Sequence, residues 1–286
     1  HQGETLAIVG ESGCGKTTLA RGLVRLRDID AGSITYMGDD ITRRRGRGLN
    51  DFRRQVTMIF QDPISSLNPR RNVRDIVLEP LSIWNRGTKA EQLATVDKIL
   101  EHVGIDPERA AESKPHQFSG GQCQRISIAR SLVLNPQMII CDEPVSALDV
   151  SIQAGVVNLF GDLQKRLGMS YVFIAHDLSV VRHIADQVAV MYLGKIVEIG
   201  DKDAVYRNPS HPYTKALLSA VPLPDPKIER SRHRIMLEGD VPSPVNPPTG
   251  CRFRTRCWKA TELCAVEEPQ LVVRSTGQQS ACHFPE

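Results

Sequence analysis

The sequence predicts an α/β fold with a largely parallel sheet, and three observations support this prediction. Short apolar segments rich in β-branched residues recur along the chain, and helix-favouring segments separate them. Strands that alternate with helices are typical of parallel sheets, because each pair of parallel strands needs a crossover connection. The third observation is a glycine-rich loop that joins the first predicted strand to the first predicted helix.

The individual elements follow from the spacing of apolar residues. Strands are predicted at residues 5–9, 55–60, 137–141, 170–175, 187–192 and 195–199. Helices are predicted at residues 17–26, 150–167 and 178–185, and a mainly helical segment at 73–134. The last two strands flank Leu193-Gly194 and should form a hairpin. The basic run at residues 43–47 is predicted to be a solvated loop.

The composition excludes several classes of function. With 41% hydrophobic and 24% charged residues, the 286-residue chain has the composition of a soluble globular protein. A formal net charge of +3, with both signs abundant, is too balanced to indicate nucleic acid by itself, and no nucleic-acid partner is predicted. The sequence has no apolar run of about 18 residues that could span a membrane. It begins at His1 with neither a signal peptide nor a methionine, so we expect it to be part of a longer chain.

A phosphate-binding loop (P-loop) follows the first strand. The pattern G-x-x-x-x-G-K-[ST] is matched by Gly10, Glu11, Ser12, Gly13, Cys14, Gly15, Lys16 and Thr17, and Thr18 completes the predicted nucleotide site. Glycines at these positions let backbone N–H groups converge on phosphate oxygens at the start of a helix. Lys16 should reach the β- and γ-phosphates, and Thr17 should bind Mg²⁺.

Two acids follow the strand predicted at residues 137–141. Asp142 lies at the end of this strand and can hold Mg²⁺ through water. Glu143 can polarise an attacking water as a general base. Adjacent acids after a strand often form only a solvated turn, but the P-loop upstream favours the catalytic interpretation.

A second anion site is predicted before the helix that runs through Arg130. It consists of Ser119, Gly120, Gly121 and Gln122, which place a serine and two glycines at a helix start. One chain needs a single site for the γ-phosphate, so a second such site predicts that two chains share ATP.

The order of these motifs resembles the ABC ATPase family over residues 3–205. This resemblance implies that Gln61 contacts Mg²⁺ and the attacking water, and that Asp149 belongs to a loop that crosses to the partner subunit. It also implies that His176 contacts the γ-phosphate, which makes Lys16, Gln61, Glu143 and His176 the candidate catalytic set. Members of the family usually stack adenine on an aromatic residue before the P-loop. Only nine residues precede Gly10 and none is aromatic, so those strands are expected to be missing.

Three further segments are similar to a narrower group, the oligopeptide and dipeptide importers. They are residues 61–69, 211–218 and 250–253. The resemblance implies ATP-driven peptide uptake at the cytoplasmic face of the cell membrane. It also implies a second ABC ATPase domain, two membrane permease subunits and, indirectly, an extracytoplasmic peptide-binding protein as partners. The alternative is a non-transport ABC ATPase that acts on nucleic acid or ribosomes.

The chain is predicted to have two parts, divided near residue 205. Residues 1–205 form the nucleotide-binding domain, with a helical insert at about 65–134, and residues 206–286 form a C-terminal extension with a proline-rich connector at 221–248.

The extension carries four of the seven cysteines: Cys251, Cys257, Cys264 and Cys282. A reducing compartment disfavours disulfides, and four thiolates suit a [4Fe–4S] cluster or a zinc ion. The resemblance to the importers favours the iron–sulfur cluster, with Zn²⁺ or unliganded thiols as alternatives.

Overall fold

The computed structural model describes residues 1–222 and 234–286, which form two compact units. Unit 1 contains residues 1–3 and 18–172, and unit 2 contains residues 4–17 and 173–286. The chain passes between the units after Gly3, inside helix α1 (Lys16–Leu23) and inside strand β6 (Ser170–Ala175). Part of the proline-rich connector predicted at 221–248 lies outside the described residues.

Unit 1 combines a short parallel strand pair with a group of helices. Its elements are β2 (Thr35–Tyr36), β3 (Asp39–Asp40), α2 (Gly46–Gln55), β4 (Val56–Ile59), α3 (Pro63–Ser66), α4 (Val73–Ile83), α5 (Lys89–His102), α6 (Pro107–Glu112), the 3₁₀ helix η1 (Pro115–Gln117), α7 (Gly120–Leu132), β5 (Met138–Asp142) and α8 (Val150–Leu167). Strands β4 and β5 run parallel, with Ile59 opposite Cys141. This register brings the residues that follow both strands to one edge of the sheet.

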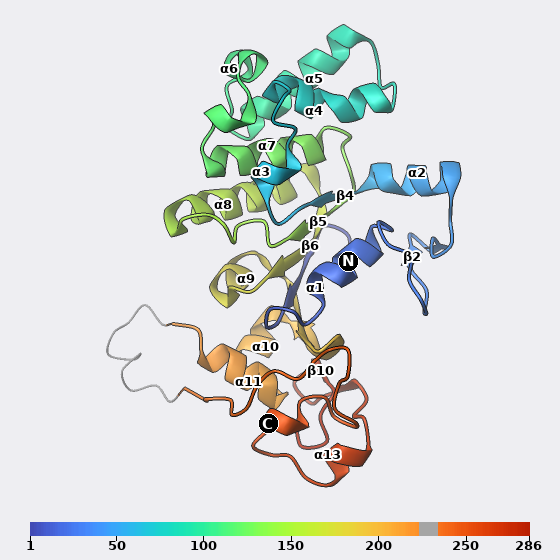
Figure 1. Cartoon of the computed structure of the whole chain (residues 1–286), viewed down its shortest axis with the longest axis vertical. Coiled ribbons are helices and arrows are strands. Elements are labelled where there is room, and N and C mark those ends of the chain that lie inside the picture. Colours follow the sequence, from blue (N-terminus) through green and yellow to red (C-terminus); the bar gives the residue numbers. More distant parts are fainter. Residues whose placement is uncertain (223–233) are drawn as a thin grey trace. The chain divides into compact units, whose positions relative to one another are not determined.

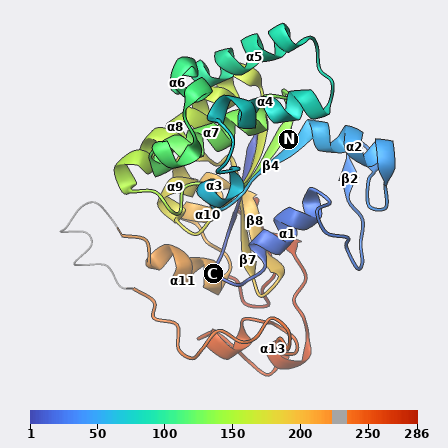
Figure 2. The same ribbon diagram turned by 45° about the horizontal axis from the view of Figure 1, so that its top comes forward.

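Helix α7 lies at the centre of the helical part of unit 1. It packs against α3, α4, α5, α8 and β4, and Ile126, Ile128 and Ala129 on it are fully buried. Helices α4, α5, α6 and α7 lie together in both ribbon views (Figure 1, Figure 2). The helical segment predicted at residues 73–134 is therefore confirmed.

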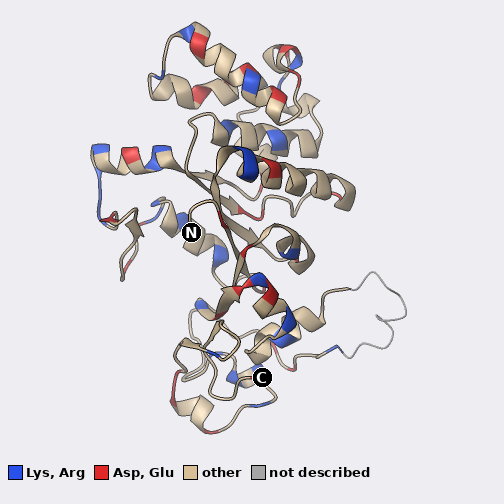
Figure 3. Cartoon of the chain, turned by 180° about the vertical axis from the view of Figure 1, so that it is seen from behind, with Lys and Arg blue, Asp and Glu red and all other residues tan. Residues whose placement is uncertain are grey.

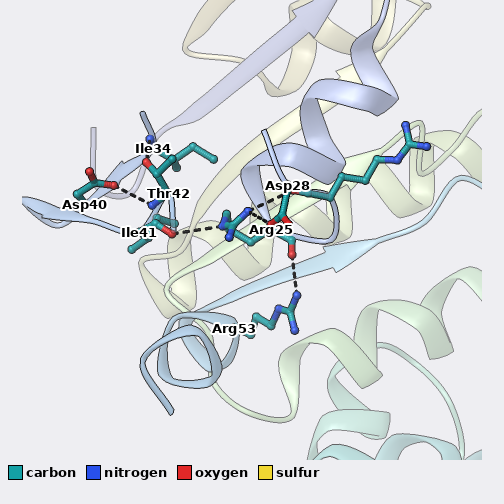
Figure 4. Close-up of polar contacts among 8 residues, drawn as sticks. Arg25, Asp28, Ile34, Asp40, Ile41, Thr42 and Arg53 are labelled. Atoms are coloured by element: carbon teal, nitrogen blue, oxygen red, sulfur yellow. Dashed lines mark hydrogen bonds and ion pairs between the residues drawn. The ribbon is translucent and has the colours of Figure 1, made fainter. Parts of the chain in front are cut away.

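The end of α1 is fixed by a buried arginine. Helix α1 was predicted to reach residue 26 but ends at Leu23, and Arg25 has a left-handed backbone with φ of 57°. The Arg25 guanidinium donates to the Asp28 carboxylate at 2.8 Å and to the carbonyl of Ile41 at 3.3 Å (Figure 4). Arg53 in α2 donates to the Arg25 carbonyl at 2.6 Å. These long-range contacts, which local periodicity cannot reveal, stop the helix early.

The basic run predicted as a loop is partly helical. Residues 43–45 precede α2, but α2 begins at Gly46 and includes Arg47. The helix buries Phe52, whose ring lies 5.3 Å from that of Tyr36. Tertiary packing of one aromatic face thus stabilises a segment whose composition suggests a loop.

Unit 2 is built on a mixed sheet. Its elements are β1 (Thr5–Val9), the end of β6, α9 (Leu178–Ile184), β7 (Gln187–Tyr192), β8 (Lys195–Asp201), α10 (Lys202–Arg207), α11 (Pro212–Ser219), the 3₁₀ helix η2 (Arg254–Arg256), α13 (Leu263–Val266), β9 (Val272–Val273) and β10 (Gln279–Ser280). The strands follow the order β1-β7-β8-β10-β9, parallel between β1 and β7 and antiparallel elsewhere. The predicted β7–β8 hairpin is confirmed. The two-residue strands β9 and β10 are too short for a periodic signal.

The residues after 205 pack onto the hairpin through an aromatic cluster. The Tyr213 ring of α11 lies 4.7 Å from Tyr192 at the end of β7, and Phe253 lies 5.2 Å from Tyr192 and 5.4 Å from Tyr213. All three side chains are almost fully buried. This cluster is the apolar core that joins the extension to the sheet of unit 2.

A buried carboxylate in β8 completes the attachment of the extension. Glu198 is fully buried and accepts hydrogen bonds from the backbone N–H groups of Ser210 at 2.7 Å and His211 at 2.8 Å. The side-chain amide of Gln278 also donates to it, at 3.4 Å. Burial raises the pKa of Glu198, although these hydrogen bonds lower it in turn.

We predict that Glu198→Ala lowers the free energy of unfolding by about 3 kcal/mol, because it leaves two buried backbone donors without an acceptor. Urea denaturation of both proteins measures the difference. Glu268→Ala is the matched control, since Glu268 forms only an exposed pair with Lys195 at 2.8 Å and should cost less than about 1 kcal/mol. An equal loss in the two variants would contradict the assigned role.

Charged residues of both signs occur along the helices. Figure 3 marks Lys and Arg as well as Asp and Glu on them. Across residues 1–222 and 234–286, every helix is too short or too polar to cross a lipid bilayer.

Candidate functional site

The P-loop lies in unit 2, between β1 and the start of α1. Strand β1 is buried and pairs with β7, and the loop turns directly after Val9. A Cβ atom on Gly10 would lie 2.1 Å from the carbonyl oxygen of Met191 in β7. Glycine is therefore required where the loop leaves the sheet, since any side chain would collide with the neighbouring strand.

The lysine of the P-loop lies inside the loop. Lys16 is 4% exposed, and its amine donates to the carbonyl oxygens of Gly10 at 2.9 Å and Glu11 at 3.1 Å. The turn of the β7–β8 hairpin supports the same loop, because the Gly194 N–H donates to the Cys14 carbonyl at 2.8 Å. The loop is thus held from both the sheet and the hairpin.

His176 shares a pocket with the P-loop. It follows β6, and it lines a pocket of about 550 Å³ together with Gly10, Glu11 and Ser12. The other walls come from α11 and from residues 235–237. The structure therefore places the predicted γ-phosphate contact beside the predicted phosphate loop, and both belong to unit 2.

Gln61 and the two acids form a second group, in unit 1. Gln61 follows β4, and Asp142 and Glu143 occur at the end of the parallel neighbour β5. The Gln61 side-chain amide donates to the Glu143 carboxylate at 3.1 Å. Asp142 is 2% exposed and lines the same pocket as Gln61. Three residues predicted from two separate segments thus converge at one edge of the sheet.

The backbone of Glu143 is unusual. Its φ of 46° lies in the left-handed region, which costs free energy for a residue with a side chain. Such conformations concentrate at functional sites, where the surrounding structure compensates for their cost. With this backbone conformation, the Glu143 side chain points in a direction that an extended strand end would not allow.

The predicted second anion site is a capped helix start. Ser119 caps α7: its hydroxyl accepts from the Gln122 N–H at 3.3 Å, and the Gln122 side chain accepts from the Ser119 N–H at 3.0 Å. Gly121 permits the close approach of α8, since a Cβ there would lie 2.4 Å from Ile152. Ser119 is exposed, and so is Asp149 at the start of α8. Both can face a second protein chain.

The four cysteines of the extension line one small pocket, together with His211 and Phe253. All seven cysteines of the chain lie in described residues, and none forms a disulfide. Burial and the neighbouring thiols raise the pKa of Cys282 to about 11. Among residues 1–222 and 234–286, no group of three or more His, Cys, Asp or Glu side chains has an arrangement that could hold a single metal ion.

Sequence reasoning missed two residues that bind the P-loop. The Arg256 guanidinium forms a two-pronged ion pair with Glu11, and the Tyr213 hydroxyl accepts a hydrogen bond from the Glu11 N–H. More than 200 residues separate each of them from the loop. No local pattern could connect such distant segments, although Tyr213 occurs in a stretch that resembles the importers, residues 211–218.

Comparison with protein families gives two matches. Residues 1–146 match the family model of the ABC transporter, and residues 197–264 match the oligopeptide/dipeptide transporter C-terminal region. The oligopeptide transport ATP-binding protein OppF of Haemophilus influenzae is 52% identical over 283 residues, which are 99% of this chain and 85% of that protein. OppF of Escherichia coli is 52% identical over 95% of this chain and 81% of that protein.

Solved structures give the same fold. The chain superposes with a TM-score of 0.65 on cbiO1 from Clostridium perfringens, part of the ABC transporter complex cbiONQ, at 29% identity over 72% of this chain and 80% of that one. It superposes with a TM-score of 0.64 on a dimeric ATP-binding cassette bound to ADP and Pi after hydrolysis, at 28% identity over 71% of this chain and 87% of that one.

Proposed function

The chain belongs to the ABC transporter family, and on that premise we propose that it is the ATP-hydrolysing subunit of an importer of oligopeptides. The observation that carries this proposal is the double match, to the ABC transporter over residues 1–146 and to the oligopeptide/dipeptide transporter region over residues 197–264. OppF proteins named for oligopeptide transport align with nearly all of the chain. These matches give no support to an ATPase that acts on nucleic acid or ribosomes.

The P-loop binds the phosphates of ATP in this proposal. Backbone N–H groups of residues 10–18 surround the phosphates, and Lys16 exchanges its hydrogen bonds to the carbonyls of Gly10 and Glu11 for bonds to phosphate oxygens. His176 contacts the γ-phosphate, and its place in the same pocket as the P-loop supports this role.

Hydrolysis is assigned to the group at the ends of β4 and β5. Glu143 accepts a proton from the attacking water, and Gln61, which already donates to the Glu143 carboxylate at 3.1 Å, orients that water. Thr17, Gln61 and Asp142 are the residues that would hold Mg²⁺. When bound, Mg²⁺ neutralises charge on the phosphate oxygens.

Two ATPase domains are needed for a complete cycle. The N-terminus of α7, with the exposed Ser119 and with Gly120, Gly121 and Gln122, would bind the γ-phosphate of an ATP held by the partner. Asp149 would cross to the same partner. The solved relative in the post-hydrolysis state is a dimer, which supports this arrangement.

The remaining partners follow from import. The helical insert at about 65–134 would dock on a cytoplasmic loop of one of the two membrane permease subunits, at the cytoplasmic face of the cell membrane. An extracytoplasmic peptide-binding protein would act on the permeases and reach this chain only indirectly.

The four-cysteine pocket is proposed to hold a [4Fe–4S] cluster. The donor set fits, because four thiols line one pocket and thiolates are the usual ligands of such clusters. When bound, the cluster would crosslink a segment that has little apolar core.

Peptide uptake tests the function directly. In cells that lack their own importer, the chain expressed with its permeases should restore uptake of a labelled oligopeptide, and Lys16→Ala should not. The tagged protein should also co-purify with the permeases. Retention of nucleic acid or ribosomes in their place, with no restored uptake, would overturn the proposal.

A further inference from the structure

The C-terminal extension contacts the P-loop through a charged pair. Arg256 lies at the end of η2, and its two terminal guanidinium nitrogens donate to different carboxylate oxygens of Glu11, at 2.8 and 3.2 Å. The Arg256 side chain is 8% exposed and that of Glu11 is 30% exposed. A forked and largely buried pair of this kind is stronger and more directional than an exposed one.

The backbone of Glu11 is held by the same part of the chain. Its N–H donates to the Tyr213 hydroxyl at 2.9 Å, and the Tyr213 ring is fully buried against Tyr192 and Phe253. Burial raises the pKa of Tyr213. Side chain and backbone of one P-loop residue are thus both fixed by the extension.

The third contact of Glu11 leads to the phosphate site. Its carbonyl oxygen accepts from the Lys16 amine at 3.1 Å. Arg256, Glu11 and His176 also line one pocket. A shift of Glu11 would therefore move the loop that surrounds the phosphates and one of the oxygens that place the lysine.

We propose that Arg256 is a positioning residue for nucleotide binding. It holds Glu11 so that the P-loop keeps the conformation that receives the phosphates, and it does so from the extension, outside the segment with the nucleotide motifs. The inference rests on ATP binding in the proposed function and does not depend on the cysteine site. The competing explanation is that the pair only attaches the extension to the rest of unit 2.

Nucleotide affinity distinguishes the two explanations. The dissociation constant of a fluorescent ATP analogue is measured for the parent subunit and for four variants. These are Arg256→Gln, Arg256→Lys, Glu11→Gln and the double variant Glu11→Gln/Arg256→Gln. Arg254→Gln is the matched control, since Arg254 lies in the same turn but donates to the Thr249 carbonyl at 3.0 Å. Thermal melting of each variant is recorded in parallel.

Positioning predicts a specific pattern. Arg256→Gln and Glu11→Gln should each weaken binding by about tenfold, and the double variant should be no weaker than either, because the two residues act as one pair. Arg256→Lys should be intermediate, since lysine keeps the charge but cannot form the fork. Arg254→Gln should bind like the parent. In steady-state assays, KM for ATP should rise while kcat is retained.

Unchanged nucleotide affinity in Arg256→Gln would overturn the inference. If the melting temperature of that variant fell at the same time, the result would be the one that a purely structural attachment predicts. If Arg256→Gln does not fold, parental affinity in the folded Arg256→Lys and Glu11→Gln variants has the same consequence. A parent protein that binds no ATP analogue would count against the proposed function itself, and not against the role of Arg256 alone.

Discussion

Glu143→Gln should lower kcat for ATP hydrolysis by at least about a hundredfold and leave ATP affinity within about twofold of the parent value. Glutamine has the shape of glutamate but cannot accept the proton of the attacking water. The backbone of Glu143, with φ of 46°, should be unaffected by the change. Phosphate release by the assembled transporter measures the rate, and a fluorescent ATP analogue measures the affinity.

The same variant should also change the lifetime of the dimer. ATP favours the closed pair of ATPase domains only through contacts to the γ-phosphate, so a dimer that cannot hydrolyse ATP should stay closed longer. Gel filtration with ATP should detect this. Glu112→Gln, a change at an exposed glutamate at the end of α6, is the control and should match the parent. Hydrolysis at the parental rate in Glu143→Gln would rule out this residue as the base.

The sequence was sufficient to predict the elements that have a clear apolar periodicity or lie next to a glycine-rich motif. Strands β1, β6 and β7 and helix α8 occur at the predicted residues. The reason is that buried strands need continuous apolar runs and a long surface helix needs one apolar face, and both requirements are local. Gln61 and Glu143 were assigned to the same attacking water, Gln61 through the resemblance to the ABC ATPase family, whereas the pairing of the strands that precede them is known only from the structure.

What the sequence could not provide depends on contacts between distant residues. Helix α2 is stabilised by burial of Phe52, and α1 is stopped by the contacts of Arg25. The pair between Glu11 and Arg256 spans 245 residues, so neither residue alone carries a signal. Glu11 was assigned to the P-loop without any partner, and Arg256 was passed over between two cysteines. Tertiary packing, and not local propensity, decided each of these features.

Anaerobically purified protein should contain about four irons and four acid-labile sulfides per chain. The basis is the donor set, because four thiols line one pocket and thiolates are the usual ligands of such clusters. Cys282→Ser should therefore reduce the bound iron severalfold.

The control separates loss of a ligand from loss of folding. Cys123→Ala removes a buried thiol in α7, outside the extension, and should keep the full iron content. One zinc per chain would replace the cluster by a structural ion and leave the ATPase assignment intact. Neither metal, in protein kept from oxygen, would show that the four thiols are unliganded. In that case the aromatic cluster of Tyr192, Tyr213 and Phe253, together with Glu198, must hold the extension without a metal.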